Sequence, residues 1–182
     1  MAVGDGWDIP EGVTPWSDFH WWKVAGNRVL ELVVLCERPL WYVGHYHRGR
    51  MVPCLGDDCR LCRDGVGAQV RYVISAAEVS TRRVGLLEVG RGVGLQLRDW
   101  AAACGRLRGL WLELTKQTSA KQSRMEVSLV QKDPGDWYLG LGIPDIQKAL
   151  YATWGKAGIE IPQQYVRADK GSPSFKAPKA VR

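Results

Sequence analysis

Short stretches in which apolar and polar residues alternate dominate this chain, and they predict a mainly β protein. An apolar run at 29–35 predicts a first strand, which resumes at 41–45 after a kink near Pro39. Further strands are expected at 71–78, 84–89, 110–115 and 125–130. In the last two, every second residue is apolar, so one face of each strand is expected to face the core. These apolar positions are Leu110, Leu112, Leu114, Met125, Val127 and Leu129.

Two segments have helical spacing. Apolar residues from Leu97 to Cys104 recur every three or four positions, after a break expected at the glycines of 90–94, and Gly105 is a natural end for this helix. A second helix is expected over 145–154, and loops are expected over 48–68 and 116–123. The order strand, strand, strand, short helix, strand, strand is that of the OB-fold, a five-stranded Greek-key barrel. We therefore expect an OB-fold barrel with one short helix between strands 3 and 4 and a C-terminal helical extension.

Composition divides the chain into four expected segments. Residues 1–20 read as a flexible acidic arm, 21–132 as the OB-fold domain, 133–161 as the helical extension and 162–182 as a basic flexible tail. The chain is too apolar for intrinsic disorder to be expected. It has no stretch of roughly 20 apolar residues that would span a membrane. The acidic start does not resemble a signal peptide, so we expect an intracellular protein without a membrane partner.

The charge of the chain is unevenly distributed and favours a polyanionic partner. The net charge is +6, and residues 1–20 contain four acidic residues and no Lys or Arg, so the remainder carries +10. The chain also contains nine tryptophans, and stacking on nucleic-acid bases is one reason to expose an indole.

A cluster of cysteines predicts one structural zinc ion. Cys54, Cys59 and Cys62 lie within nine residues, and a Cys-x2-Cys pair grips one ion from a single turn. One imidazole would complete a tetrahedron, and zinc suits three thiolates and one nitrogen. His45 and His47 both qualify, because alternation along a strand gives them the same side. The loop at 45–62 is therefore the expected zinc loop.

Two enzymatic alternatives to a structural ion can be compared with the sequence. A zinc deaminase needs His-x-Glu and Pro-Cys-x-x-Cys, and neither spacing is present. The pair His45-Tyr-His47 also suits a metal-dependent rolling-circle nickase, for which Tyr151 is the candidate nucleophile. That interpretation leaves the cysteines unexplained, so we expect a protein that is not an enzyme.

Alternation also predicts a surface for single-stranded nucleic acid. If Leu112 faces the core, Trp111 faces outward and shares a sheet face with Arg124, where a base can stack while cations meet phosphates. The other candidate contacts are Lys116, Lys121, Arg71, Trp41, Tyr46, Arg48 and Arg50. The alternative is that the C-terminal extension covers Trp111 and that the cations form an ordinary solvated hairpin.

These motifs resemble a known family. Leu87-Glu-Val-Gly90 before a short helix, then 107–114 and Met125-Glu-Val, resembles the second half of an OB-fold single-stranded DNA-binding protein. The His-x8-Cys-x4-Cys-x2-Cys pattern is similar to the zinc-carrying helix-destabilising proteins of phages. The resemblance spans about 25–132, favours His45 as the fourth ligand, and implies the coating of single-stranded DNA in replication or recombination. RNA is the alternative partner, other replication or recombination proteins are further possible partners, and the basic C-terminus differs from that family's acidic tip.

Overall fold

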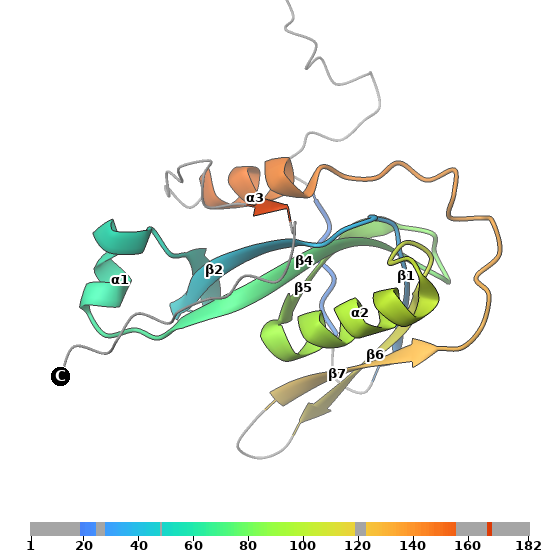
Figure 1. Ribbon diagram of the computed structural model, residues 1–182, viewed down its shortest axis with the longest axis horizontal. Coiled ribbons are helices and arrows are strands. Elements are labelled where there is room, and N and C mark those ends of the chain that lie inside the picture. Colours follow the sequence, from blue (N-terminus) through green and yellow to red (C-terminus); the bar gives the residue numbers. More distant parts are fainter. Residues whose placement is uncertain (1–18, 25–27, 48, 119–122, 156–166, 169–182) are drawn as a thin grey trace, which may run out of the picture.

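The computed structural model describes residues 19–24, 28–47, 49–118, 123–155 and 167–168 (Figure 1), and the structural statements below concern these residues. The strands are β1 (Leu30–Val34), β2 (Leu40–His47), β3 (Arg50–Pro53), β4 (Ala68–Glu78), β5 (Val84–Gly90), β6 (Trp111–Thr118), β7 (Ser123–Val130) and β8 (Arg167–Ala168). The helices are the 3-10 turn η2 (Gly56–Asp58), α1 (Arg60–Arg63), α2 (Arg91–Cys104) and α3 (Ile146–Gly155).

The strands form one curled antiparallel sheet. Their order is β3-β2-β4-β1-β6-β7, while β5 pairs with β4 and β8 pairs with β2. β1 and β2 pair with successive parts of β4, as the pairs Val34↔Ala76 and Leu40↔Val73 show. They therefore act as one long strand that bends between Val34 and Leu40, close to the kink expected at Pro39.

The sheet forms an open half-barrel, and the closed five-stranded barrel expected from the sequence is not confirmed. Within the described residues, β5 pairs along its length with β4 alone and β7 with β6 alone, so no ladder joins these two strands. Part of the outer edge of β5 is already occupied. The amide of Leu86 donates to the carbonyl of His20, and the amide of Trp22 donates to the carbonyl of Leu86, each at 2.8 Å.

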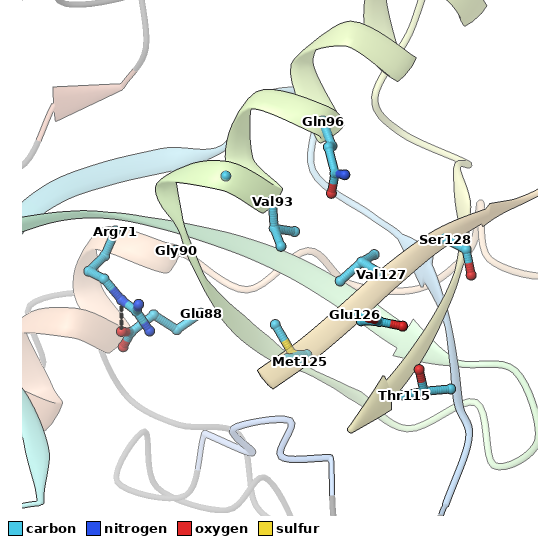
Figure 2. A pocket seen from close by; sticks show the side chains of 11 residues that line it. Arg71, Glu88, Gly90, Val93, Gln96, Thr115, Met125, Glu126, Val127 and Ser128 are labelled. Carbon is cyan, nitrogen blue, oxygen red and sulfur yellow. Dashed lines mark hydrogen bonds and ion pairs between the residues drawn. The ribbon is translucent and has the colours of Figure 1, made fainter. Parts of the chain in front are cut away.

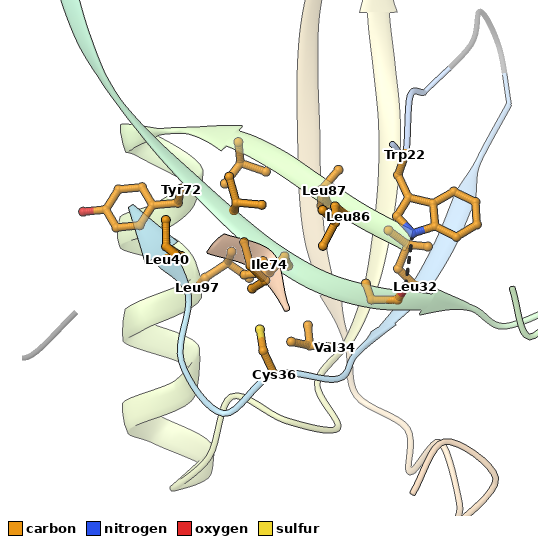
Figure 3. Packing of buried hydrophobic residues seen from close by; sticks show 14 of the residues in the cluster. Trp22, Leu32, Val34, Cys36, Leu40, Tyr72, Ile74, Leu86, Leu87 and Leu97 are labelled. Atoms are coloured by element: carbon orange, nitrogen blue, oxygen red, sulfur yellow. Dashed lines mark hydrogen bonds between the residues drawn. The ribbon is translucent and has the colours of Figure 1, made fainter. Parts of the chain in front are cut away.

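Two helices pack on opposite sides of this sheet (Figure 1). α2 lies against the concave side, where Leu97 is 1% exposed and joins Leu32, Ile74 and Leu87 in the main buried cluster (Figure 3). α3 lies against the other side, where Trp154 packs edge-on against Tyr42 with ring centroids 4.9 Å apart. Because α3 contributes Ala149, Leu150 and Trp154 to the main cluster, the segment expected as a separate extension is part of the domain core.

The alternating patterns are confirmed, but three element boundaries were wrong. Part of the loop expected at 48–68 is strand β3, whose β-forming Met51 and Val52 pair with Tyr46 and His45. The hairpin loop expected at 116–123 is strand at both of its ends, since β6 continues to Thr118 and β7 begins at Ser123. The glycines expected to break the chain before the helix instead lie at its N-terminus, because α2 begins at Arg91.

The packing of α2 explains why a helix tolerates these glycines. A Cβ at Gly94 would overlap the ring of Tyr72 on β4, so a glycine is needed for the helix to approach the strand. Within the segment expected as a basic tail at 162–182, Arg167 and Ala168 pair with Trp41 and Leu40 as β8. The acidic arm lies outside the described residues except for Phe19 and His20.

Candidate metal centre

Local backbone structure brings the three cysteines to one end of the sheet. Cys54 follows β3 directly, and its amide donates to the carbonyl of Val43 on β2 at 2.8 Å. Gly56 has a φ of 69°, which lets the chain turn into η2, and the amide of Cys59 closes that turn on the carbonyl of Gly56. Cys62 then lies on the single turn of α1.

The side chains of these cysteines converge on His45. The Nδ1 or Nε2 of His45 and the Sγ atoms of Cys54, Cys59 and Cys62 all lie within 4.8 Å of one another. His45 Nε2 is 3.4 Å from both Cys59 Sγ and Cys62 Sγ, and Cys54 Sγ is 3.5 Å from Cys62 Sγ. The four residues predicted as ligands therefore form one cluster.

These separations match the edges of a tetrahedron around one ion. Bonds of about 2.3 Å to sulfur and about 2.0 Å to nitrogen give S···S and S···N edges of about 3.8 and about 3.5 Å. The separations of 3.4 and 3.5 Å are within a few tenths of an ångström of those edges. These three separations are compatible with one ion bound by the cluster, and four protein ligands would give a closed site of the structural type.

The carbonyl of Val66 fixes the tautomer of the histidine. A carbonyl oxygen only accepts, so His45 Nδ1, at 2.9 Å from it, must carry the proton and donate. The lone pair of Nε2 then points at the sulfur atoms, as metal ligation requires. His45 is fully buried, so its ring is held in this orientation.

The thiols are crowded enough to require a cation if they are to ionise together. Burial opposes ionisation of Cys59, but hydrogen bonds from the surrounding backbone and from Cys54 outweigh it and lower the pKa of Cys59 to about 7. Burial, together with the neighbouring Cys54 and Cys59, raises the pKa of Cys62 to about 12. Ionisation of one thiol therefore makes ionisation of its neighbour less favourable. A divalent ion bound between them would offset this repulsion and stabilise all three thiolates.

The arrangement required by the nickase alternative is not assembled here. Both nitrogens of His45 face atoms of the cluster or of Val66, and His47 is not part of the cluster. The hydroxyl of Tyr151 is buried, and its ring packs at 6.3 Å from that of Trp154. A nucleophile needs access to its substrate, so these positions count against the alternative.

Trp111 is not an open stacking platform. Its indole packs against a second apolar cluster formed by Val33, Leu35, Ala77 and Tyr138, and its nitrogen is buried. The segment around Trp137 and Leu141 packs against the same cluster. The structure therefore favours the alternative that chain beyond the sheet covers this indole.

The expected pairing of Trp111 with Arg124 on one surface also needs correction. Trp111 lies opposite Val130 and Arg124 lies opposite Gln117, so the two share a face but sit at opposite ends of the hairpin. Six residues of strand separate them by about 20 Å. A single base contact cannot include both.

The remaining predicted contacts lie in different environments. Arg71 is ion-paired to Glu88, with Nε 2.7 Å from Oε1, and Trp41 packs against the main cluster. Lys116 is exposed on β6, and Tyr46 is 61% exposed on β2. Arg50 is on β3 and Arg124 on β7, while Arg48 and Lys121 lie outside the described residues.

Sequence reasoning missed a groove at the open side of the half-barrel. It has a volume of about 670 Å³ and lies between the β4–β5 pair, α2 and the β6–β7 hairpin (Figure 2). The ion pair of Arg71 and Glu88 lines one end, while Thr115, Glu126 and Ser128 line the other. Gly90 and Gly92, which border it, were the available signal, since glycines leave room beside a strand end.

Comparison with known proteins yields no relative: the chain matches no protein-family model, no curated protein and no solved structure. Among the described helices, none combines the length and the apolar character needed to cross a membrane.

Proposed function

We propose that this chain is a zinc-stabilised module that binds single-stranded DNA without strong sequence preference. The observation that carries the proposal is the pairing pattern of the strands. A bent first strand (β1 and β2) pairs with both β4 and β6, β4 pairs with β5, β6 pairs with β7, and α2 connects β5 to β6. An OB barrel left open between its third and fifth strands would show this connectivity, and OB-folds are partly open barrels that bind oligonucleotides.

The positions of the groove and the metal loop support the same proposal. OB-folds bind oligonucleotides on strands 2 and 3 and with the loops that follow strands 1 and 4. In this chain the corresponding elements are β4 and β5, the segment between β2 and β4 that carries the cysteines (the metal loop), and the β6–β7 hairpin. The groove lies beside β4 and β5 and is bordered by that hairpin. The +10 charge outside the first 20 residues would attract phosphates.

Zinc is the metal we propose. Three thiolates and one imidazole form a soft, mixed donor set that favours a tetrahedral d¹⁰ ion, and four protein ligands leave no position for a reacting water. The ion would tie β2, the end of β3 and α1 together, because its ligands come from these segments. Its role in the proposal is to brace one end of the sheet.

DNA binding is tested by anisotropy with a labelled oligo-dT of about 20 nucleotides, long enough to fill one OB-fold site. If about three phosphates are contacted, affinity should fall roughly twentyfold between about 50 and about 200 mM salt. Matched RNA and duplex competitors report the preference. The proposal is contradicted if the protein binds no single strand at the lower salt or prefers duplex DNA. If RNA binds more tightly than DNA, single-stranded RNA replaces DNA as the proposed ligand.

The metal is tested separately by elemental analysis of the purified protein. We expect one zinc per chain, lost in Cys59→Ser and kept in Cys104→Ser, whose thiol is exposed and outside the cluster. Because metal binding is coupled to folding, only the first variant should melt at a clearly lower temperature. Equal zinc content in the two variants would contradict the assigned ligand set.

A further inference from the structure

Tyr46 differs from the other aromatic residues of the described chain in being exposed. Its side chain is 61% exposed, whereas every other described Trp, Tyr and Phe is buried or half-buried. A base can stack only on a ring that solvent reaches, and such a contact tolerates any base. Tyr46 is therefore the aromatic residue of the described part that is ready to receive one.

A metal ion in the His45 cluster would hold Tyr46 in place. Tyr46 follows His45 directly, and neighbouring residues of a strand point to opposite faces, so His45 faces the cysteines and Tyr46 faces outward. Tyr46 pairs with Met51 on β3, and β3 ends one residue before Cys54. β3 is the terminal strand of the sheet order, so a bound ion would tie this outer hairpin to the domain.

Strand register connects Tyr46 with the groove. Tyr42 lies opposite Arg71 and Gly44 lies opposite Gln69, and residues two apart share a face. Tyr46, Gln69 and Arg71 are therefore on the same face of the sheet. Gln69 is exposed, and Arg71 lines the groove.

At the groove end of this path Arg71 is partly buried beside Glu88, and Glu126 also lines the groove, so a phosphate there would have to compete with carboxylates for the guanidinium. The ion pair of Arg71 with Glu88 runs through Nε of the guanidinium (Figure 2). A Cβ at Gly90 would come within 3.3 Å of Arg71 Nη1, so a side chain at this position would crowd that nitrogen. Arginine can bind a phosphate through its terminal nitrogens.

From these observations we infer that a single strand of nucleic acid crosses the metal-braced end of the sheet, with one base stacked on Tyr46 and its backbone passing Gln69 and Arg71 into the groove. This inference rests on the proposed DNA binding and assigns its surface. It replaces Trp111, which is covered, as the stacking residue. It also makes binding depend on the metal, because without the ion the outer hairpin loses its anchor.

The test compares variants of the full zinc-loaded protein in binding oligo-dT at low salt. Tyr46→Ala should weaken binding between roughly fivefold and a hundredfold, the range for the loss of one stacked base. Tyr46→Trp should bind at least as well as the wild type. Val29→Ala, which shortens another exposed apolar side chain at 56% exposure, is the matched control and should bind like the wild type. Zinc content and melting temperature check that every variant is folded.

A second oligomer separates stacking from other effects. Replacing the bases of a central stretch by abasic linkers should weaken binding to the wild type but cause no additional loss in Tyr46→Ala. If Tyr46→Ala binds oligo-dT as tightly as the wild type does, the inference about Tyr46 is wrong, but the proposed DNA binding still holds. A wild type that binds no strand overturns both. If sedimentation shows a dimer that Tyr46→Ala abolishes while DNA affinity is unchanged, the surface belongs to a second copy and the inference fails.

Discussion

The imidazole of His45 donates a hydrogen bond from Nδ1 to the carbonyl of Val66, 2.9 Å away and 21 positions later in the chain. This contact joins β2 to the segment that leads from the metal loop into β4. It also leaves the lone pair of Nε2 directed at two cysteine sulfurs. A single backbone carbonyl therefore fixes the tautomer in which His45 faces the cysteines.

The two histidines of this strand should behave differently when replaced. His45→Ala is expected to lose the metal or bind it much more weakly, because it removes a ligand and leaves the carbonyl of Val66 without its donor. His47→Ala should still bind one metal ion per chain, since His47 lies outside the cluster. Cobalt substitution provides the measurement, because the visible spectrum of Co²⁺ reports a change in ligand number. Identical cobalt spectra in both variants would exclude His45 as a ligand.

Reactivity of the five thiols should depend on the metal. With the ion bound, iodoacetamide is expected to modify Cys104, which is exposed and outside the cluster. After chelation, the half-buried Cys54 and the exposed Cys62 should become accessible and react as well, with Cys62 the slower because its pKa is raised. Cys36 should stay unmodified until unfolding, because burial raises the pKa of its thiol. Mass spectrometry of the alkylated peptides gives the answer, and rapid modification of Cys62 in metal-loaded protein would contradict it.

Local sequence patterns sufficed where neighbours in the chain decide the structure. Leu110, Leu112 and Leu114 alternate, and all three are buried. The four metal ligands lie within 18 positions, and the Cys-x2-Cys spacing depends only on one turn of backbone. Alternation could not distinguish His45 from His47 as a ligand. The position of the histidine relative to the cysteines and to Val66 depends on tertiary structure, which the local sequence does not show.

Patterns failed where a distant segment decides which face is covered. Alternation gives Trp111 the face opposite Leu112, but that face is covered at this point by the cluster that includes Tyr138. The missing pairing between β5 and β7 also depends on a distant segment, because the backbone of His20 and Trp22 occupies part of the edge of β5. Neither segment carries a local signal that it will pair with or pack on the sheet.

Two glycines of α2 offer a matched pair of substitutions. Gly94→Ala should lower the free energy of unfolding by roughly 1–3 kcal/mol, the cost of an overpacked core, because the new methyl group overlaps Tyr72. Gly92→Ala should raise it by about 0.5–1 kcal/mol, since alanine favours the helix and no atom lies within 4 Å of the added Cβ. Urea titrations give both values. Equal effects of the two substitutions would show that α2 does not pack closely on β4.

The pH dependence of stability should reveal the buried phenol of Tyr42. Burial, reinforced by the carboxylate of Glu88, raises the pKa of Tyr42 far above its ordinary value. The folded state therefore keeps this proton at a pH where the unfolded chain releases it, so unfolding becomes more favourable as pH rises above about 10. Tyr42→Phe removes this titration and should flatten the alkaline loss of stability relative to the wild type. Tyr46→Phe is the control, because it removes a phenol that is exposed and not buried. Urea unfolding at several pH values between about 8 and about 11 measures the slopes, and parallel curves for the wild type and Tyr42→Phe would contradict the assignment.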